Sequence, residues 1–253
     1  MRALVFDLLG FEKSTIANKR LPKNAFYNTL DLSKKEEKIL KEDIDNIYLL
    51  AVYNKNTINI ELYLDDEINC TEIDWIFVTL NKGKKYKSVL ELIHKLIPNQ
   101  TIVVLSDEDY ICFSTTIKRL NKVEEGKVVV DKIITSPWMD IEYLSSEEKT
   151  FIESIKVKKA QYKNLKETHE ALYAAIELTE AIEKVNMYPK IIENLKELEK
   201  VIESINEVEE SISTLKNKEI EEESFGTKME YHIKIKDKED VLNKLKDRLK
   251  ELC

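Results

Sequence analysis

The spacing of apolar side chains divides the chain into two regions. From residue 145 to the end, apolar residues recur at three- and four-residue intervals, with one glycine and one proline in the whole stretch. This is the spacing of one face of a helix. Before that point, alternating or continuous β-branched runs are interspersed with helix-like segments, which is typical of strands between helices. The pattern predicts an α+β domain at residues 1–143, followed by a long-helix, coiled-coil-like region at residues 144–253.

Two helices of the first region are predicted from capping-box patterns, in which a serine is followed three residues later by a glutamate. Ser33 with Glu36 precedes apolar positions that fall on one helical face, and we expect a helix over residues 33–51. The second such serine, Ser88, precedes an apolar stripe that ends just before Pro98.

Strands are predicted where apolar residues alternate or run together. The two runs at 101–106 and 110–116 are separated by three acidic residues, which indicates a hairpin. With the helices between them, the strands predict a mixed or antiparallel sheet. The expected strands are residues 57–64, 73–80, 101–106, 110–116 and 127–134.

The second region has the spacing of a coiled coil, with an imperfect apolar seam. Residues 229–236 alternate as a strand would, but their flanks are helical, and we favour a helix there. The pattern fits a hairpin within one chain as well as pairing between two chains. A heptad assignment from Phe151 places Lys158, Leu165, Leu172 and Thr179 at a positions, and Ile155, Tyr162, His169 and Ile176 at d positions.

Charge narrows the range of functions. The formal net charge is -8, from 48 acidic and 40 basic residues, which argues against non-specific wrapping of DNA by the chain as a whole. One polar segment departs from this balance, since Lys13, Lys19, Arg20 and Lys23 occur there without an acid. We expect these four residues to contact nucleic acid or an acidic partner, the alternative being a solvated loop.

Other chemistry finds little support in the sequence. Three scattered cysteines suit a reducing compartment, and no apolar run is long enough to span a membrane, so we expect a cytoplasmic protein. The three histidines lack metal-ligand spacing, and a structural role is expected for His94 and His169. Glycine-rich phosphate-binding patterns do not occur. Neither a cofactor nor a metal site is predicted.

A divergent magnesium-dependent nuclease is an alternative hypothesis. Such enzymes hold the metal with two carboxylates beside a lysine that polarises the attacking water. Glu61, Asp74 and Lys82 are the residues that would serve here. The segment after Asp74 lacks the expected second carboxylate, so we interpret its polar positions as solvent-facing strand residues.

Several short motifs resemble one prokaryotic protein family. They are an N-K-x-[IL]-P-K-x-x-[FY] opening, a D-I-x-x-I helix, a T-x-N-I turn and an I-P pair before an apolar strand. The chain is similar, over most of its length, to the family catalogued as domain of unknown function four-three-nine-one. The matching residues are Asn18, Lys19, Leu21, Pro22, Lys23 and Phe26; Asp43, Ile44 and Ile47; Thr57, Asn59 and Ile60; and Ile97 and Pro98.

The resemblance implies a context rather than a reaction. The family is similar to accessory proteins found beside helicases and DNA methyltransferases in restriction-like defence loci. The resemblance therefore implies that the chain is a non-enzymatic accessory subunit of a prokaryotic antiviral or restriction-modification-like system. Its partner would be the helicase or the DNA methyltransferase, and DNA would be contacted through the complex. A self-associating coiled-coil scaffold, a homodimer through the helical region, is the other alternative.

Overall fold

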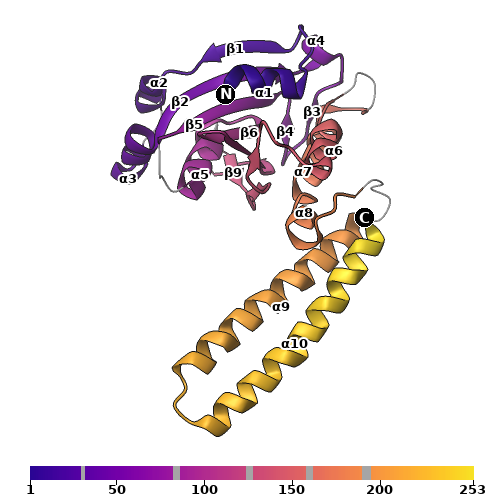
Figure 1. The fold of residues 1–253 in the computed structure, drawn as a ribbon. Coiled ribbons are helices and arrows are strands. Elements are labelled where there is room, and N and C mark those ends of the chain that lie inside the picture. Colours follow the sequence, from indigo (N-terminus) through magenta and orange to yellow (C-terminus); the bar gives the residue numbers. More distant parts are fainter. Residues whose placement is uncertain (30–31, 82–85, 124–127, 158–161, 190–194) are drawn as a thin grey trace. The chain divides into compact units, whose positions relative to one another are not determined.

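A computed structural model of the chain describes residues 1–29, 32–81, 86–123, 128–157, 162–189 and 195–253 (Figure 1). These residues form two compact units, Met1–Glu177 and Leu178–Cys253. The first is an α+β unit built on a mixed sheet and the second is helical, so the predicted fold class is confirmed. The division falls later than the pattern suggests, because the helices that begin at residue 146 pack with the first unit.

The main sheet of the first unit has the strand order β1-β2-β5-β6-β7-β10, and β11 also pairs with β7. The β5–β6 pair is parallel, and α5 makes the crossover that a parallel pair requires. The β1–β2, β2–β5 and β6–β7 pairs are antiparallel. The strands are β1 Ile16–Arg20, β2 Ile44–Tyr53, β5 Ile73–Leu80, β6 Gln100–Asp107, β7 Tyr110–Thr115, β10 Ile134–Thr135 and β11 Met139–Asp140, with two small ladders, β3 Tyr63–Leu64 with β4 Asn69–Cys70 and β8 Lys118–Leu120 with β9 Val128–Val130.

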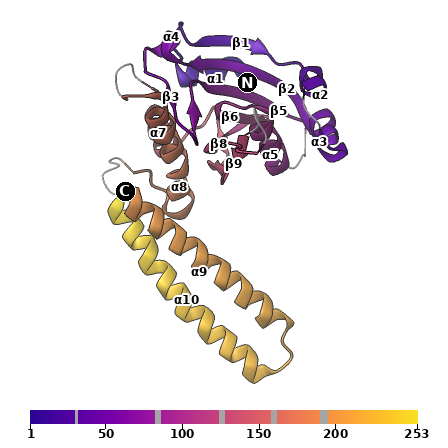
Figure 2. The same cartoon turned by 180° about the vertical axis from the view of Figure 1, so that it is seen from behind.

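Helices pack around this sheet, and α2 and α3 lie at one end of β1 and β2 while α4 lies at the other (Figure 1, Figure 2). A π-helical turn, Ile39–Asp43, connects α3 to β2. The helices of the first unit are α1 Arg2–Leu9, α2 Lys23–Thr29, α3 Lys34–Lys38, α4 Lys55–Ile58, α5 Tyr86–Leu96, α6 Ser146–Ser154 and α7 Leu165–Glu177. Those of the second are α8 Glu180–Val185, α9 Leu195–Glu221 and α10 Phe225–Leu252.

The central strands carry the core of the first unit. β5 and β6 are buried along almost their whole length, because both faces of the sheet are covered, and this explains their near-continuous apolar sequence. On one face, the apolar side of α5 packs on alternate residues such as Ile76 and Val103. On β7, Phe113 contacts Phe151 of α6 edge-on, with 5.4 Å between ring centroids. The predicted strands 73–80, 101–106 and 110–116 are confirmed.

The predicted helix over residues 33–51 is wrong beyond Asp43, where β2 begins. The buried positions of β2 include Ile44, Ile47 and Leu50, which are three residues apart. Its pairing with β5 shifts register twice along the strand, and an extra residue in a strand turns the two-residue period locally into three. The bulged strand therefore imitates the apolar spacing of a helix. The capping box at Ser33 is present and begins the short helix α3.

The predicted strand at 57–64 is mostly wrong as well. Asn54 caps the single turn of α4 by accepting hydrogen bonds from the N–H groups of Asn56 and Thr57. Asn59 ends that turn in the left-handed region, with φ of 54°, and β3 begins only at Tyr63. The helix near Ser88 is confirmed, but it begins at Tyr86. The expected strand at 127–134 forms two short strands, β9 and β10, and residue 127 lies outside the described residues.

The heptad assignment from Phe151 is wrong for the described part of the segment to Ile176, and Lys158 lies outside the described residues. α6 ends at Ser154, and α7 begins at Leu165 and packs against β7 and β10. The apolar seam is buried against the sheet instead of against a second long helix. Trp138 contacts Tyr86 of α5 edge-on at 5.5 Å between ring centroids.

The second unit contains an antiparallel hairpin, since α9 and α10 lie side by side in both views (Figure 1, Figure 2). Residues 229–236 are helical, as predicted. Leu198, Ile202 and Ile205 of α9 are buried, and ion pairs connect the two helices. These pairs are Glu197 with Arg248 (2.5 Å), Glu209 with Lys246 (3.1 Å) and Lys216 with Glu239 (3.4 Å).

Candidate functional site

An open groove of about 550 Å³ lies beside α2, α3 and the π-helical turn. We call it the basic groove, because four of its eight lining residues are lysines. Two glutamates, an asparagine and a tyrosine complete the lining. The residues are Lys23, Asn24, Tyr27, Lys34, Glu37, Lys38, Lys41 and Glu42.

The α3 wall of the basic groove is fixed by Glu36. Its carboxylate accepts hydrogen bonds from the backbone N–H of Ser33 (2.8 Å) and from Lys95 Nζ on α5 (2.5 Å). These hydrogen bonds lower the pKa of Glu36 to about 2, and the one from Lys95 has the largest effect. Ile39 and Leu40 then bury the far side of this segment in the core. The lysines of α3 are therefore held on a helix anchored at both ends.

Lys23 fixes the α2 wall to the sheet. Its ammonium group donates to the carbonyl oxygens of Ile44 and Lys41. Burial lowers the pKa of Lys23, Asp45 opposes that shift, and the positive charge of Arg20 adds to it. Arg20, the last residue of β1, therefore adds positive potential beside Lys23.

The structure separates the four predicted binding residues. β1 runs antiparallel to β2, and the N–H of Val52 donates to Thr15 at one end of the pair, whereas Arg20 is opposite Tyr48 towards the other. Lys13 therefore lies beyond the end of β1 that is remote from the groove. Arg20 and Lys23 lie at the groove end, and Lys19 is exposed on β1 between them and Lys13.

Sequence reasoning missed the lysines that complete the basic groove, namely Lys34, Lys38 and Lys41. A signal was present, because residues 13–41 contain eight basic and three acidic residues in a chain of net charge -8. The acids of the 33–42 segment concealed it. One of them, Glu42, is 3.9 Å from Lys38 in an exposed i,i+4 pair, and such pairs contribute little. Among the described residues, Lys34 and Lys41 have no carboxylate within ion-pair distance.

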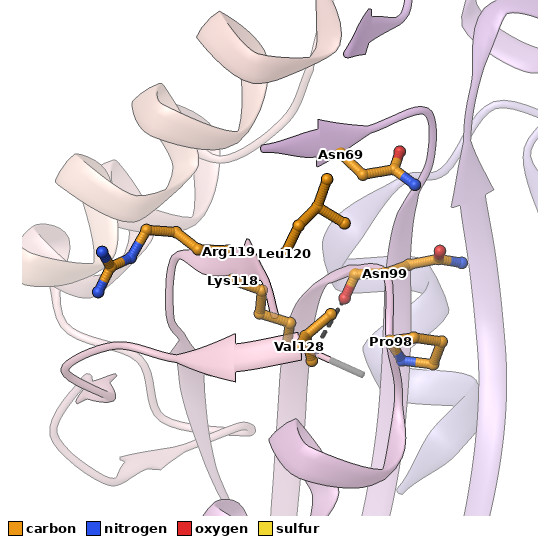
Figure 3. A pocket seen from close by; sticks show the side chains of 7 residues that line it. All are labelled: Asn69, Pro98, Asn99, Lys118, Arg119, Leu120 and Val128. Atoms are coloured by element: carbon orange, nitrogen blue, oxygen red, sulfur yellow. Dashed lines mark hydrogen bonds between the residues drawn. The ribbon is translucent and has the colours of Figure 1, made fainter. Parts of the chain in front are cut away.

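A second polar cluster is buried at the other end of the central strands (Figure 3). Lys118 is 2% exposed, and its Nζ donates to Ile97 O (2.6 Å), Asn99 O (2.7 Å) and Thr101 Oγ1 (2.8 Å). Its backbone exchanges two hydrogen bonds with the side-chain amide of Gln100. All three ammonium hydrogens are thus used inside the protein.

Asp74 lies near this lysine at the start of β5. It is 6% exposed and accepts a hydrogen bond from Asn99 Nδ2 (3.0 Å). Burial raises the pKa of Asp74 to about 6 and lowers the pKa of Lys118 to about 7. The pocket above Lys118 has a volume of only about 110 Å³, room for a few water molecules. Arg119, at its rim, pairs with Asp131 and points away from Lys118 (Figure 3).

His94 and His169 are both buried in the core, as predicted for structural histidines. His94 Nε2 is 3.0 Å from Ser114 Oγ, and His169 Nε2 is 3.1 Å from Thr115 Oγ1. Burial holds the pKa of His94 well below its usual value and lowers that of His169 to about 3, so both rings are neutral. The hydrogen bonds of these two histidines connect α5 and α7 to β7.

The nuclease hypothesis draws on residues in different surroundings. Asp74 is buried as described, which corrects the expectation of a solvent-facing position. Glu61 is exposed and pairs with Lys55 Nζ at 2.9 Å. Lys82 lies outside the described residues. In the part of the chain that the structure describes, no three His, Cys, Asp or Glu residues are grouped so that they could hold a metal ion.

Fold and surface together define an α+β protein with a basic groove and an appended helical hairpin. The chain belongs to the family described as Domain of unknown function (DUF4391), whose model matches residues 9–242. A search of curated proteins and a search of solved structures gave no significant match. None of the helices in the described ranges is both long and apolar enough to cross a membrane.

Proposed function

We propose that the protein is a non-enzymatic accessory subunit that binds a helicase or DNA methyltransferase of a prokaryotic antiviral or restriction-modification-like system. In this proposal the α9–α10 hairpin supplies the partner-binding surface, and the basic residues of the first unit contribute a contact with nucleic acid. The identity of the partner follows from the family resemblance set out above.

The observation that carries this proposal is an exposed apolar stripe on α10. Phe225, Met229 and Ile233 are 79%, 45% and 57% exposed, and their four-residue spacing places them on one side of the helix. Ile220, near the end of α9, is 77% exposed. These side chains flank the connection between the two helices. We call Ile220, Phe225, Met229 and Ile233 the hairpin-end stripe.

The hairpin-end stripe differs from the earlier part of α9, where Leu198, Ile202, Ile205 and Ile212 are buried. Large apolar side chains grouped in one place on a surface favour a protein contact. Helices that present such a stripe dock into apolar grooves or complete helical bundles, and the charges around the stripe select the partner. A binding subunit needs such a surface, whereas a free-standing enzyme does not.

The hairpin experiment measures how much of the partner co-purifies with variants of the hairpin-end stripe. We expect Phe225→Ser combined with Met229→Ser and Ile233→Ser to reduce co-purification of the helicase or methyltransferase encoded nearby by about tenfold or more, because apolar burial supplies most of the affinity. Helical content should not change, since these side chains are exposed. Val241→Ser, also exposed on α10, is the matched control. Retention of the partner by the triple variant would disprove the proposed docking surface.

Self-association is the competing outcome for the same stripe. Light scattering on the isolated chain distinguishes it, because a dimer that forms alone and dissociates in the triple variant identifies a coiled-coil scaffold. The nuclease alternative has its own test in Asp74→Asn. Loss of magnesium-dependent DNA cleavage without loss of partner binding would establish an enzyme in place of an accessory subunit.

A further inference from the structure

We infer that the basic groove binds a single strand of nucleic acid, with the lysines contacting phosphates and Tyr27 adjoining a base. This inference concerns the first unit by itself and does not depend on which partner the hairpin binds. The binding site comprises the basic groove and the cations of β1 that lead to it.

Charge distribution is the first argument. A chain of net charge -8 repels a polyanion over most of its surface, so binding must be confined to where cations gather. The segment 13–41, with eight basic residues against three acids, is that place. The fold brings the cations of α2, α3 and the π-helical turn together, because residues 23–42 line the same groove.

The second argument is the path that the cations follow. β1 is at the end of the strand order, and all five of its residues are exposed. Lys19 and Arg20 on this strand lead to Lys23 at the start of α2. Lys34 and Lys41 line the same groove as Lys23. A line of cations of this kind suits the regular phosphates of an extended strand.

Tyr27 favours a single strand over a duplex. It lines the basic groove, and its hydroxyl donates to Glu37 O at 3.4 Å. Proteins that bind single strands combine a cationic groove with aromatic side chains on which bases stack. Bases in a duplex are already stacked on one another and do not reach a side chain in a groove of about 550 Å³.

The glutamates of the groove distinguish nucleic acid from an acidic peptide. Glu37 and Glu42 lie among the lysines, where they would repel any anionic group that approached them directly, a phosphate or a carboxylate. A nucleotide carries hydrogen-bond donors as well as negative charge, and carboxylates accept hydrogen bonds from the amino groups of bases. Mixed cations and carboxylates therefore fit a phosphate with its base better than a purely anionic chain.

The test is fluorescence anisotropy of a labelled single-stranded oligonucleotide of about 20 nucleotides with the full chain. We expect Lys34→Glu with Lys41→Glu to lower the association constant by about tenfold or more at low salt. Both side chains are exposed, so the melting temperature should be unchanged. Lys200→Glu with Lys244→Glu makes the same charge change at exposed positions of the hairpin and should bind like the wild type.

Four outcomes would overturn the inference. The groove variant could bind as tightly as the wild type, or the hairpin control could lose binding equally. Poly-glutamate of similar length could also displace the oligonucleotide as effectively as unlabelled single strand, and the groove would then be a site for acidic peptides. Tighter binding of the same sequence as a duplex would contradict the role of Tyr27. All of these results leave the hairpin experiment unaffected.

Discussion

Lys118 and the exposed lysines of the basic groove, all in the first unit, lie in opposite surroundings. Lys118 is buried, and three oxygen acceptors of its own chain occupy its ammonium hydrogens. Lys34 and Lys41 are exposed, and within the described residues no carboxylate pairs with them. The difference shows that a cation can bind an external anion only if the fold leaves its hydrogen bonds available. Lys118 accordingly stabilises the fold, and the basic groove is the site for a ligand.

Replacing Lys118 should produce the largest effect on stability. Lys118→Met removes the donor for the carbonyl of Ile97 and the hydrogen bond that the Thr101 hydroxyl accepts, at a position that is 2% exposed. Leaving buried polar groups unpaired costs about 3 kcal/mol of unfolding free energy in such a site. Urea denaturation followed by circular dichroism measures it. Lys122→Met, at a lysine whose side chain is 70% exposed, should change the stability by less than about 0.5 kcal/mol.

The next prediction concerns the pH dependence of the unfolding free energy, an effect smaller than that of replacing Lys118. Lys118 has a pKa of about 7 in the folded protein and 10.5 ordinarily, so above pH 7 the unfolded chain holds a proton that the folded chain has released. Stability should therefore rise with pH, by about 2 kcal/mol from this group over two pH units. Asp74, with its pKa raised from 3.8 to about 6, acts oppositely. There the folded chain holds the extra proton, and the contribution of this group to stability falls as pH rises from about 4 to 6.

The pH effect is isolated by comparing each variant with the wild type. The stability difference between the wild type and Lys118→Met should rise from pH 7 to pH 9, and the difference between the wild type and Asp74→Asn should fall from pH 4 to pH 6. His94 and His169 raise the stability of both proteins as pH rises over the acidic range, so the difference carries the prediction. A wild-type stability that runs parallel to both variants from pH 4 to pH 9 would show that neither group titrates as described.

The smallest predicted effect is that of removing the cap of α3, which should change both stability and binding at the basic groove. Ser33→Ala removes the cap of α3 and should cost about 1 kcal/mol, while weakening oligonucleotide binding, because Lys34 and Lys38 are on that helix. Ser145→Ala removes an equivalent capping box from α6. It should cost a similar amount of stability and leave binding unchanged. Equal loss of binding in both variants would mean that stability alone controls the site.

Helices and strands whose apolar residues follow one clear spacing are predictable from this sequence. Those whose apolar spacing fits both a helix and a strand are not. The buried strands β5, β6 and β7 and the amphipathic α5 follow from apolar runs and a single helical stripe. β2 does not, because its bulges give a spacing of three. The heptads from Phe151 match a coiled coil in spacing, but spacing alone does not say whether a sheet or a helix covers the stripe.

The candidate site was only partly predictable for a similar reason. Arg20 and Lys23 stand out in an acid-free segment, whereas Lys34, Lys38 and Lys41 are interspersed with glutamates. Glu36 pairs with Lys95, 59 residues away, and not with a lysine of its own segment, and no local pattern encodes that pairing. Lys118 was missed because its acceptors lie in residues 97–101, in a different strand and loop.

The salt dependence of oligonucleotide binding tests the central claim most directly. Removal of one lysine that neutralises a phosphate should reduce the slope of log association constant against log salt by about 0.7. We expect Lys34→Gln with Lys41→Gln to reduce that slope by about 1.4, whereas Lys200→Gln with Lys244→Gln leaves it unchanged. A groove variant with the wild-type slope would contradict the account, because its lysines would then not bind the phosphates.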